Sequence, residues 1–299
     1  MWIDSIYLSK RLDLNRFSFT ESCTSIQNMA ALAPATLGGS LKGKVALITG
    51  ASAGIGAETA RHFASLGCRL ALTGRNMDAL QAVTDECVSR GLDRDQILMI
   101  QASLELEADV KKTAEQTIQK FNQVDVLVNN AGIVIPDSIE TVTLESFDKT
   151  FAVNVRAPLQ LTQLLTPHLI KTKGTIVNVS SVNGVRAMRG VLTYCMSKTA
   201  LDHMTRCVAE ELAPHGIRVN AVNPGVIQTQ ILRRGGMSDE RYKQFLEHSK
   251  TTHAMRRTGT VDEVSKLIAF LASSDSSFTT GETITIDGGR HLLCNPVQN

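Results

Sequence analysis

Two side chains four residues apart offer acid–base chemistry: Tyr194 and Lys198 begin and end the sequence Tyr-Cys-Met-Ser-Lys. On a helix this spacing places both side chains on one face. A tyrosine hydroxyl has a pKa of ~10, which makes it a poor base at neutral pH. A neighbouring ammonium group favours the phenolate and is expected to lower that pKa. The pair can then pass a proton to or from an alcohol, although the Tyr-x-x-x-Lys pattern alone is common by chance.

A serine stands where it can join this pair. Ser181 lies thirteen residues before Tyr194 and follows the β-branched run 175–179, which we expect to be a strand. Open α/β sheets bind their ligands at the carboxyl ends of the strands. We therefore expect the Ser181 hydroxyl to hydrogen-bond the oxygen atom that reacts.

A glycine-rich turn follows the first predicted strand, with the sequence TGASAGIG over residues 49–56. Its glycines permit close approach to a pyrophosphate, and the helix that follows supplies unpaired N–H groups. The spacing TGxxxGxG differs from the common dinucleotide fingerprint GxGxxG. Such a turn can be purely structural, but its position after the first strand favours nucleotide binding. The residues expected at the cofactor are Gly50, Ser52, Gly54, Ile55 and Gly56.

The end of the second predicted strand indicates which nicotinamide cofactor is bound. NAD-binding proteins carry an acid here that accepts hydrogen bonds from the adenosine ribose. This chain has Gly74 in place of the acid, followed by Arg75 and Asn76. A guanidinium group binds a phosphate monoester in bidentate geometry. We therefore expect NADP, with NAD less favoured; the alternative is that Arg75 is a solvated surface residue.

Seven short β-branched runs alternate with segments of helical period from Lys44 onward. Each run has four to six residues and is almost continuously apolar, which is typical of strands buried on both faces. Alternation of strand and helix predicts a parallel sheet with right-handed crossovers. The expected fold class is α/β, a single doubly wound Rossmann domain with a seven-stranded parallel sheet. The expected strands are 45–49, 69–73, 97–101, 124–128, 175–179, 217–222 and 283–286.

The composition is that of an ordinary globular protein. The 299 residues are 43% hydrophobic, 20% charged and 4% aromatic, with a formal net charge of +2. This balance excludes a disordered or collagen-like chain and argues against nucleic acid as a partner. No apolar run reaches about 18 residues, so no membrane span is expected. The six cysteines have neither a CxxC pair nor zinc spacing, so we expect no metal site and a reducing, cytoplasmic location.

Taken together, these motifs resemble those of the short-chain dehydrogenase/reductase family. The resemblance covers residues 41–291 and is strongest to animal cytosolic members that themselves resemble 3-oxoacyl-carrier-protein reductases. Each motif is weak alone, but all of them in order at family spacing are specific. They are TGASAGIG at 49–56, Asn129-Asn130-Ala131-Gly132, Asn154, Ser181, Tyr194, Lys198 and Asn223-Pro224-Gly225.

The resemblance implies a role for each matched residue. Tyr194 would be the general acid in reduction and the base in oxidation, while Lys198 would hydrogen-bond the nicotinamide ribose and tune Tyr194. Ser181 would hold the substrate carbonyl, and Asn154 would anchor a water molecule in a proton relay. The implied cofactor contacts, besides Tyr194 and Lys198, are Asn130, Ala131, Gly132, Pro224, Gly225, Ile227 and Thr229.

Two positions depart from the family pattern. The third predicted strand is followed by Ser103 and Leu104, where the family usually has an aspartate in place of Ser103 that meets the adenine amino group. Both residues are still expected at the cofactor. NADP-dependent members often have a basic residue in place of Ser52, so Arg75 alone is expected to face the 2′-phosphate. A modest preference for NADP follows.

The expected function is that of an NAD(P)-dependent oxidoreductase acting on a small-molecule carbonyl or alcohol. The reaction would be NADPH-dependent reduction of a ketone or aldehyde, or oxidation of the matching secondary alcohol. The alternative, a catalytically silent nucleotide-binding scaffold protein, is disfavoured by the intact set of Asn154, Ser181, Tyr194 and Lys198.

The resemblance also places a substrate lid at residues 228–258. Arg233 and Arg234 within it are expected to be solvated, because adjacent charges on such a segment usually are; the alternative is that they meet an acidic substrate. An apolar wall of the substrate pocket is expected from Val182, Val185, Met188 and Val226.

Assembly and domain limits are predicted as follows. The helices that begin near Leu144 and Tyr194 have apolar residues beyond one face. This fits the pairing of these helices between subunits in the resembled family, which implies a homo-oligomer, a dimer or a tetramer; burial within one subunit would give the same pattern. We expect a disordered N-terminal extension over residues 1–40 and an NADP-binding domain over residues 41–299. The alternative for the extension is a mitochondrial transit peptide, supported by Lys10, Arg11 and Arg16 and opposed by Asp4, Asp13 and Glu21.

Overall fold

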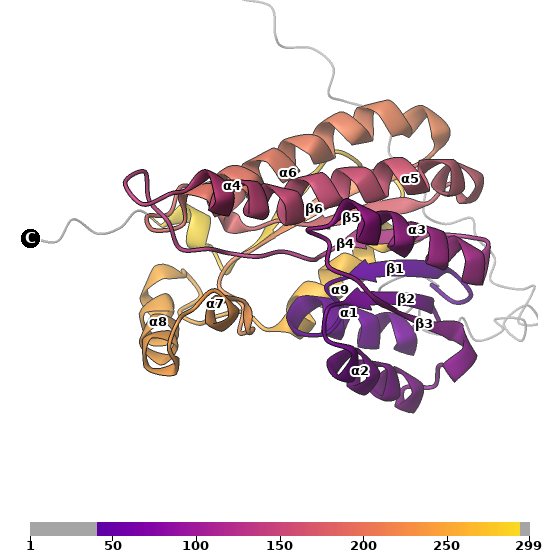
Figure 1. The fold of residues 1–299 in the computed structure, drawn as a ribbon, viewed down its shortest axis with the longest axis horizontal. Coiled ribbons are helices and arrows are strands. Elements are labelled where there is room, and N and C mark those ends of the chain that lie inside the picture. The colour runs from indigo at the N-terminus through magenta and orange to yellow at the C-terminus, as the bar shows by residue number, and fades with distance from the viewer. Residues whose placement is uncertain (1–40, 294–299) are drawn as a thin grey trace, which may run out of the picture. The chain divides into compact units, whose positions relative to one another are not determined.

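A seven-stranded parallel sheet lies at the centre of the fold (Figure 1). The computed structural model describes residues 41–293, so the predicted extension over residues 1–40 lies outside the described part. The strand order is β3-β2-β1-β4-β5-β6-β7, and every neighbouring pair is parallel. The strands are β1 (Val45–Thr49), β2 (Arg69–Gly74), β3 (Ile97–Gln101), β4 (Val126–Asn129), β5 (Thr175–Val179), β6 (Arg218–Pro224) and β7 (Thr283–Ile286).

Helices cover both faces of this sheet: α1, α2 and α9 lie on one face, and α3, α5 and α6 on the other (Figure 1). Because both faces are covered, alternate residues of β1 enter different cores: Ala46 and Ile48 enter one, and Leu47 enters the other. The helices are α1 (Gly54–Ser65), α2 (Met77–Ser89), α3 (Glu107–Phe121), α4 (Leu144–Phe151), α5 (Ala157–Thr172), α6 (Leu192–Leu212), α7 (Ile231–Arg234), α8 (Asp239–Thr252) and α9 (Val261–Ala272).

The predicted fold class is confirmed, and the strands β1, β3, β5 and β7 have the predicted bounds. β2 ends one residue later than predicted, and β6 spans Arg218–Pro224 and not 217–222. β4 begins at Val126 and not at Val124 and ends at Asn129. Asp125 forms a bend there, and its carboxylate turns back onto β1. A side-chain contact of this kind leaves no periodic signal in the sequence.

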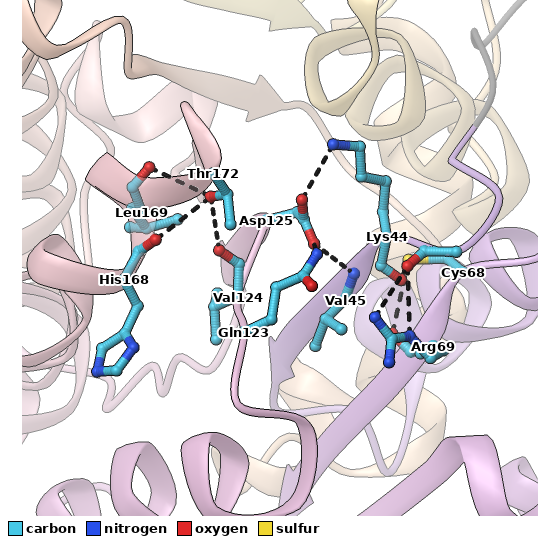
Figure 2. A network of polar contacts seen from close by, with 11 residues as sticks. Lys44, Val45, Cys68, Arg69, Gln123, Val124, Asp125, His168, Leu169 and Thr172 are labelled. Atoms are coloured by element: carbon cyan, nitrogen blue, oxygen red, sulfur yellow. Dashed lines mark hydrogen bonds and ion pairs between the residues drawn. The ribbon is translucent and has the colours of Figure 1, made fainter.

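Asp125 ties together the amino ends of β1, β4 and β5; Figure 2 shows it beside Lys44 and Val45. Its carboxylate is 4% exposed and accepts hydrogen bonds from the Val45 N–H at 2.9 Å and from Lys44 Nζ at 3.0 Å. The backbone carbonyl of Asp125 accepts from the Thr175 N–H of β5 at 2.8 Å. A buried carboxylate with several donors fixes strand position, because leaving its partners unpaired is costly.

Candidate active site

The turn at residues 49–56 joins β1 to α1 and is closely packed. Gly50 and Gly54 have φ angles of +64° and +59°, in the left-handed region that favours glycine. A Cβ on Gly50 would lie 2.9 Å from the Cα of Ala131, and Gly56 has no room for a Cβ beside the Asn130 amide. The glycines thus allow the backbone of this turn to contact the loop that follows β4.

That loop is fastened to β1 by hydrogen bonds. The Thr49 hydroxyl accepts from the backbone N–H groups of Asn130 and Ala131, both at 2.9 Å. The Asn130 amide donates to the Thr49 carbonyl at 2.8 Å. The strand order reverses between β1 and β4, and open α/β sheets bind nucleotides in the crevice at such a point.

Helix α6 carries Tyr194 and Lys198 on one face, as their spacing predicts. Lys198 Nζ donates to the carbonyl of Val179, the last residue of β5, at 2.8 Å, and it lies 5.7 Å from the centroid of the Tyr194 ring. Lys198 is 3% exposed. Burial lowers the pKa of Lys198 to about 8, and the charge of Asp202 acts in the opposite direction. The ammonium group therefore titrates close to physiological pH.

The hydroxyl of Tyr194 differs from the expectation. Burial raises the pKa of Tyr194 to about 12, and a hydrogen bond with Ser181 opposes the rise. The predicted lowering of this pKa by Lys198 is wrong, because the ammonium group donates to a strand carbonyl and faces the ring. A tyrosine that keeps its proton at neutral pH is suited to give that proton to a carbonyl oxygen.

Ser181 follows the carboxyl end of β5 and is held from two sides. Its hydroxyl accepts from the Asn183 N–H at 3.1 Å and caps the 3₁₀ turn η4 (Val182–Gly184). Its carbonyl accepts from the Asn223 side chain of β6 at 2.9 Å. The hydroxyl oxygen accepts the bond from Asn183, so its own proton is the one donated in the hydrogen bond with Tyr194.

Asn154 is fully buried in a π-helical turn, η3 (Ala152–Arg156), between α4 and α5. Its Oδ1 accepts from the Ile133 N–H at 2.9 Å, and its Nδ2 donates to the Ile133 carbonyl at 2.9 Å and to Ser197 Oγ at 3.0 Å. The side chain thus joins the loop after β4 to α6. Short π-helical turns are frequent at functional sites.

Asp202 is a further charged residue beside Lys198 that was not expected from the sequence. It lies one helical turn after Lys198 on α6, is 2% exposed, and accepts a hydrogen bond from the Asn223 amide at 2.8 Å. Burial raises the pKa of Asp202, whereas hydrogen bonds from Ser180 and Asn223 and the charge of Lys198 lower it. The i, i+4 spacing of the acid from Lys198 is the signal that could have indicated this contact.

A cavity lies beside the carboxyl end of β2. It has a volume of 620 Å³ and is lined by Ser52, Arg75, Asn76, Asp78 and Arg234. A Cβ on Gly74 would lie 3.1 Å from both Cβ and Oγ of Ser52. The acid that NAD-binding proteins carry at this point would therefore crowd Ser52.

Arg234 was not expected at this cavity. It is exposed, as predicted, but Arg75 alone was expected to face the phosphate. Helix α7, which carries Arg234, is a single turn of four residues. A segment this short has no amphipathic period from which its place in the fold could be predicted.

The segment after β6 carries another group of predicted cofactor residues. Pro224 ends β6, and the Gly225 N–H is hydrogen-bonded to β7 at 3.1 Å. Ile227 is half-buried and pairs with Gly259 in an isolated bridge. The methyl group of Thr229 would lie 3.3 Å from a Cβ on Gly54, so the start of the predicted lid contacts the phosphate-binding turn.

Ser103 and Leu104 lie further along the same edge of the sheet, after β3. The Ser103 N–H donates to the Asp109 carboxylate at 2.7 Å, and Leu104 is buried. Neither residue lines the 620 Å³ cavity.

The four residues expected to form an apolar wall of the substrate pocket lie in different surroundings. Val182 is 3% exposed and belongs to the core, whereas Met188 and Val226 are half-buried. Val185 lines a second cavity, also of 620 Å³, together with Cys195 and Met196 of α6. Tyr194 is not among the residues that line this second cavity.

Two features are absent from residues 41–293. No group of three or more His, Cys, Asp or Glu side chains there could hold a metal ion. No helix in this range is long and apolar enough to cross a membrane.

Comparison with known proteins places this geometry in a family. A family profile described as "Enoyl-(Acyl carrier protein) reductase" matches residues 50–291. The 3-oxoacyl-[acyl-carrier-protein] reductase of Thermotoga maritima is 37% identical over 260 residues, which cover 83% of this chain and 98% of that protein. The L-xylulose reductase of Caenorhabditis elegans is 37% identical over 245 residues, which cover 81% of this chain and 94% of that protein.

A solved structure agrees with this assignment. The 3-ketoacyl-(acyl-carrier-protein) reductase from Brucella melitensis, complexed with NADH, is 35% identical and superposes with a TM-score of 0.76; the match covers 84% of this chain and 100% of that chain. The chain belongs to the short-chain dehydrogenase/reductase family of oxidoreductases, as its motifs predict. Proteins of this family bind a nicotinamide cofactor.

Proposed function

We propose that this chain is an NADPH-dependent reductase of ketones or aldehydes, which also oxidises the matching secondary alcohols. The observation that carries the proposal is the meeting of Tyr194, Ser181, Lys198 and Asn154 beside the nucleotide crevice. A Cβ on Gly132 would lie 3.5 Å from both Lys198 Nζ and Asn154 Oδ1. The loop that bounds the crevice therefore contacts the catalytic groups directly.

The proposed proton transfer uses the two hydroxyl groups. Ser181 donates a hydrogen bond to the substrate carbonyl oxygen, and Tyr194 gives its proton to that oxygen. When bound, the reduced nicotinamide supplies the hydride to the carbonyl carbon. Lys198 holds a charge beside the tyrosine ring, and a water molecule on the Asn154 carbonyl would return a proton to Tyr194. In alcohol oxidation the same groups take the proton back.

The residues of this edge can hold the whole dinucleotide. The pyrophosphate would lie against the N–H groups at the start of α1, and the adenosine ribose beside the 620 Å³ cavity. The proposed contacts at the adenosine end are Arg75 and Asn76 with the ribose, and Ser103 and Leu104 with the adenine. The pyrophosphate would contact Gly50, Ser52, Gly54, Ile55 and Gly56. Asn130, Ala131, Gly132, Tyr194 and Lys198 would lie along the crevice, and Pro224, Gly225, Ile227 and Thr229 at the nicotinamide.

NADP is the proposed cofactor, with NAD second. The Brucella relative is complexed with NADH, so membership of the family does not decide the preference. Two features of this chain support NADP. Arg75 lines the cavity at the end of β2, and an acidic side chain in place of Gly74 would crowd Ser52. A guanidinium pairs well with the 2′-phosphate that distinguishes NADP.

Assembly and location are proposed on separate grounds. Apolar side chains stay exposed on α4, α5 and α6: Leu144 is 82% exposed, Leu159 50% and Met196 45%. Large exposed apolar side chains on neighbouring helices favour pairing of subunits, and we propose a homo-oligomer, specifically a homotetramer.

We also propose a cytoplasmic location, a catalytic domain over residues 41–299, and an N-terminal extension that takes no part in catalysis.

The experiment that tests the function is a substrate panel followed by NADPH absorbance. The panel contains 3-oxoacyl thioesters, ketoses and simple aldehydes, the first two because similar proteins are named for such substrates. We expect turnover of at least one class, faster with NADPH than with NADH, and none in a Tyr194→Phe variant. NADPH binding without turnover of any compound would instead favour the scaffold alternative.

A further inference from the structure

The two neighbouring arginines of α7 differ in their surroundings. Arg233 is engaged: its Nε donates to the Asp239 carboxylate at 2.6 Å, and its guanidinium lies 4.1 Å from the centroid of the Tyr242 ring. The Tyr242 hydroxyl donates to the Thr229 carbonyl at 3.0 Å. Arg233 thus fastens α7 to α8 within the predicted lid.

Arg234 faces the nucleotide side of the lid. It is exposed and, like Arg75, lines the cavity beside the carboxyl end of β2. Within residues 41–293, the structure gives neither guanidinium group a side-chain hydrogen bond or ion pair. Two arginines and one carboxylate, Asp78, line the cavity, which leaves one net positive charge there. Like charges around one cavity favour an anion between them.

A phosphate monoester fits this arrangement. Arginine binds phosphate through two parallel N–H donors, and the Ser52 hydroxyl on the same cavity can add a third donor. The cavity adjoins the position where the adenosine ribose is proposed to bind. The anion that fits is therefore the 2′-phosphate of the cofactor.

The cavity is connected to the lid through the backbone. Thr229, at the start of the lid, packs beside Gly54 of the phosphate-binding turn. At the other end of α7, a Cβ on Gly235 would lie 2.8 Å from the Val134 carbonyl, in the segment after β4. Helix α7 is thus held between the phosphate-binding turn and the segment after β4, with Arg234 on its cavity side.

We propose that Arg234 and Arg75 together bind the 2′-phosphate of NADP(H), so that this phosphate fastens the substrate lid. The inference rests on the proposed function, in that it takes NADP(H) as the cofactor. NAD(H) has a free ribose hydroxyl in place of the phosphate and leaves Arg234 without a partner. The 2′-phosphate therefore holds the substrate lid in place, in addition to its contribution to cofactor affinity.

The test compares two nucleotides that differ in the 2′-phosphate, adenosine 2′,5′-bisphosphate and AMP, by calorimetry on the full chain. We expect Arg234→Gln to weaken bisphosphate binding about tenfold, the loss of a charge-assisted hydrogen bond, and to leave AMP binding unchanged. Arg234→Lys keeps the charge without the bidentate geometry, so its affinity for the bisphosphate is expected to lie between those of the parent chain and Arg234→Gln. The matched control is Arg241→Gln, which removes one exposed arginine of α8 that does not line the cavity.

Hydrogen exchange of residues 228–252 tests the fastening of the lid. In the parent chain, the bisphosphate is expected to slow exchange there more than AMP does, and in Arg234→Gln this difference is expected to vanish. Equal bisphosphate affinities of Arg234→Gln and Arg241→Gln, with weaker binding in Arg75→Gln, would overturn the role of Arg234 and leave the NADP preference standing. A parent chain that binds both nucleotides equally would overturn both proposals.

Discussion

The rate of carbonyl reduction is expected to fall as the pH rises from 7 to 9, because Lys198 loses its proton in this range. Burial lowers the pKa of Lys198 to about 8. About nine-tenths of the molecules then hold the ammonium form at pH 7, and about one-tenth at pH 9. Tyr194 does not contribute to the fall, because burial raises its pKa to about 12 and it stays protonated. We therefore expect kcat to be about tenfold lower at pH 9 than at pH 7.

Two variants separate Lys198 from other titrating groups. Lys198→Arg keeps its charge from pH 7 to 9, since a guanidinium group is not deprotonated in proteins. The fall of kcat with pH is therefore expected to disappear in this variant, even if its kcat at pH 7 is below that of the parent. Asp202→Asn removes the carboxylate whose charge raises the pKa of Lys198, so the midpoint is expected to move to lower pH.

The assay is the initial rate at saturating NADPH and carbonyl substrate, measured from about pH 6 to about pH 10. Binding of NADPH is measured in parallel, so that loss of cofactor affinity is separated from loss of turnover. Three results would refute the reasoning: a parent profile that stays flat through pH 9, the same fall in Lys198→Arg, or an unchanged midpoint in Asp202→Asn.

Four further outcomes are expected. Tyr194→Phe should lower kcat by about 10²–10⁴-fold with NADPH affinity retained in a fluorescence titration; turnover within a factor of two of the parent would contradict its role as the acid. Arg75→Asp should weaken NADPH binding about tenfold or more and move the kcat/KM ratio toward NADH, and an unchanged ratio would exclude Arg75 from the phosphate site. Asp125→Ala should reduce the free energy of unfolding in urea by about 1–3 kcal/mol, because Lys44 and the Val45 N–H lose their acceptor, and kcat should not change; a lower kcat would show that this edge of the sheet is coupled to catalysis. Deletion of residues 1–35 should leave kcat/KM and the melting temperature unchanged, since the site described is built from residues 41–293; a fall of either would show that the extension acts on the domain.

The parts that could be predicted from sequence depend on local periodicity. The bounds of β1 and β5 follow from their unbroken apolar runs, which are buried on both faces. The common face of Tyr194 and Lys198 follows from a spacing of four on a helix. The turn at residues 49–56 follows from glycines between a strand and a helix.

The parts that could not be predicted depend on tertiary contacts. The shifted start of β4 results from the Asp125 carboxylate bonding to another strand. The pKa of Tyr194 is governed by burial, which the sequence around it does not specify. Arg234 reaches a cavity formed by residues more than a hundred positions earlier in the chain. None of these contacts has a local pattern that could indicate it.

The hydrogen bonds of Thr49 with Asn130 and Ala131 have a consequence for the heat-capacity change of cofactor binding. They join the two sides of the nucleotide crevice within the folded chain itself. A ligand that enters such a preformed crevice orders few further groups, so little conformational entropy is lost there. The heat-capacity change of binding should then reflect only the apolar area that the dinucleotide covers, without the large negative values of coupled folding. Any excess measured by calorimetry at several temperatures would report ordering outside the crevice, in residues 228–258.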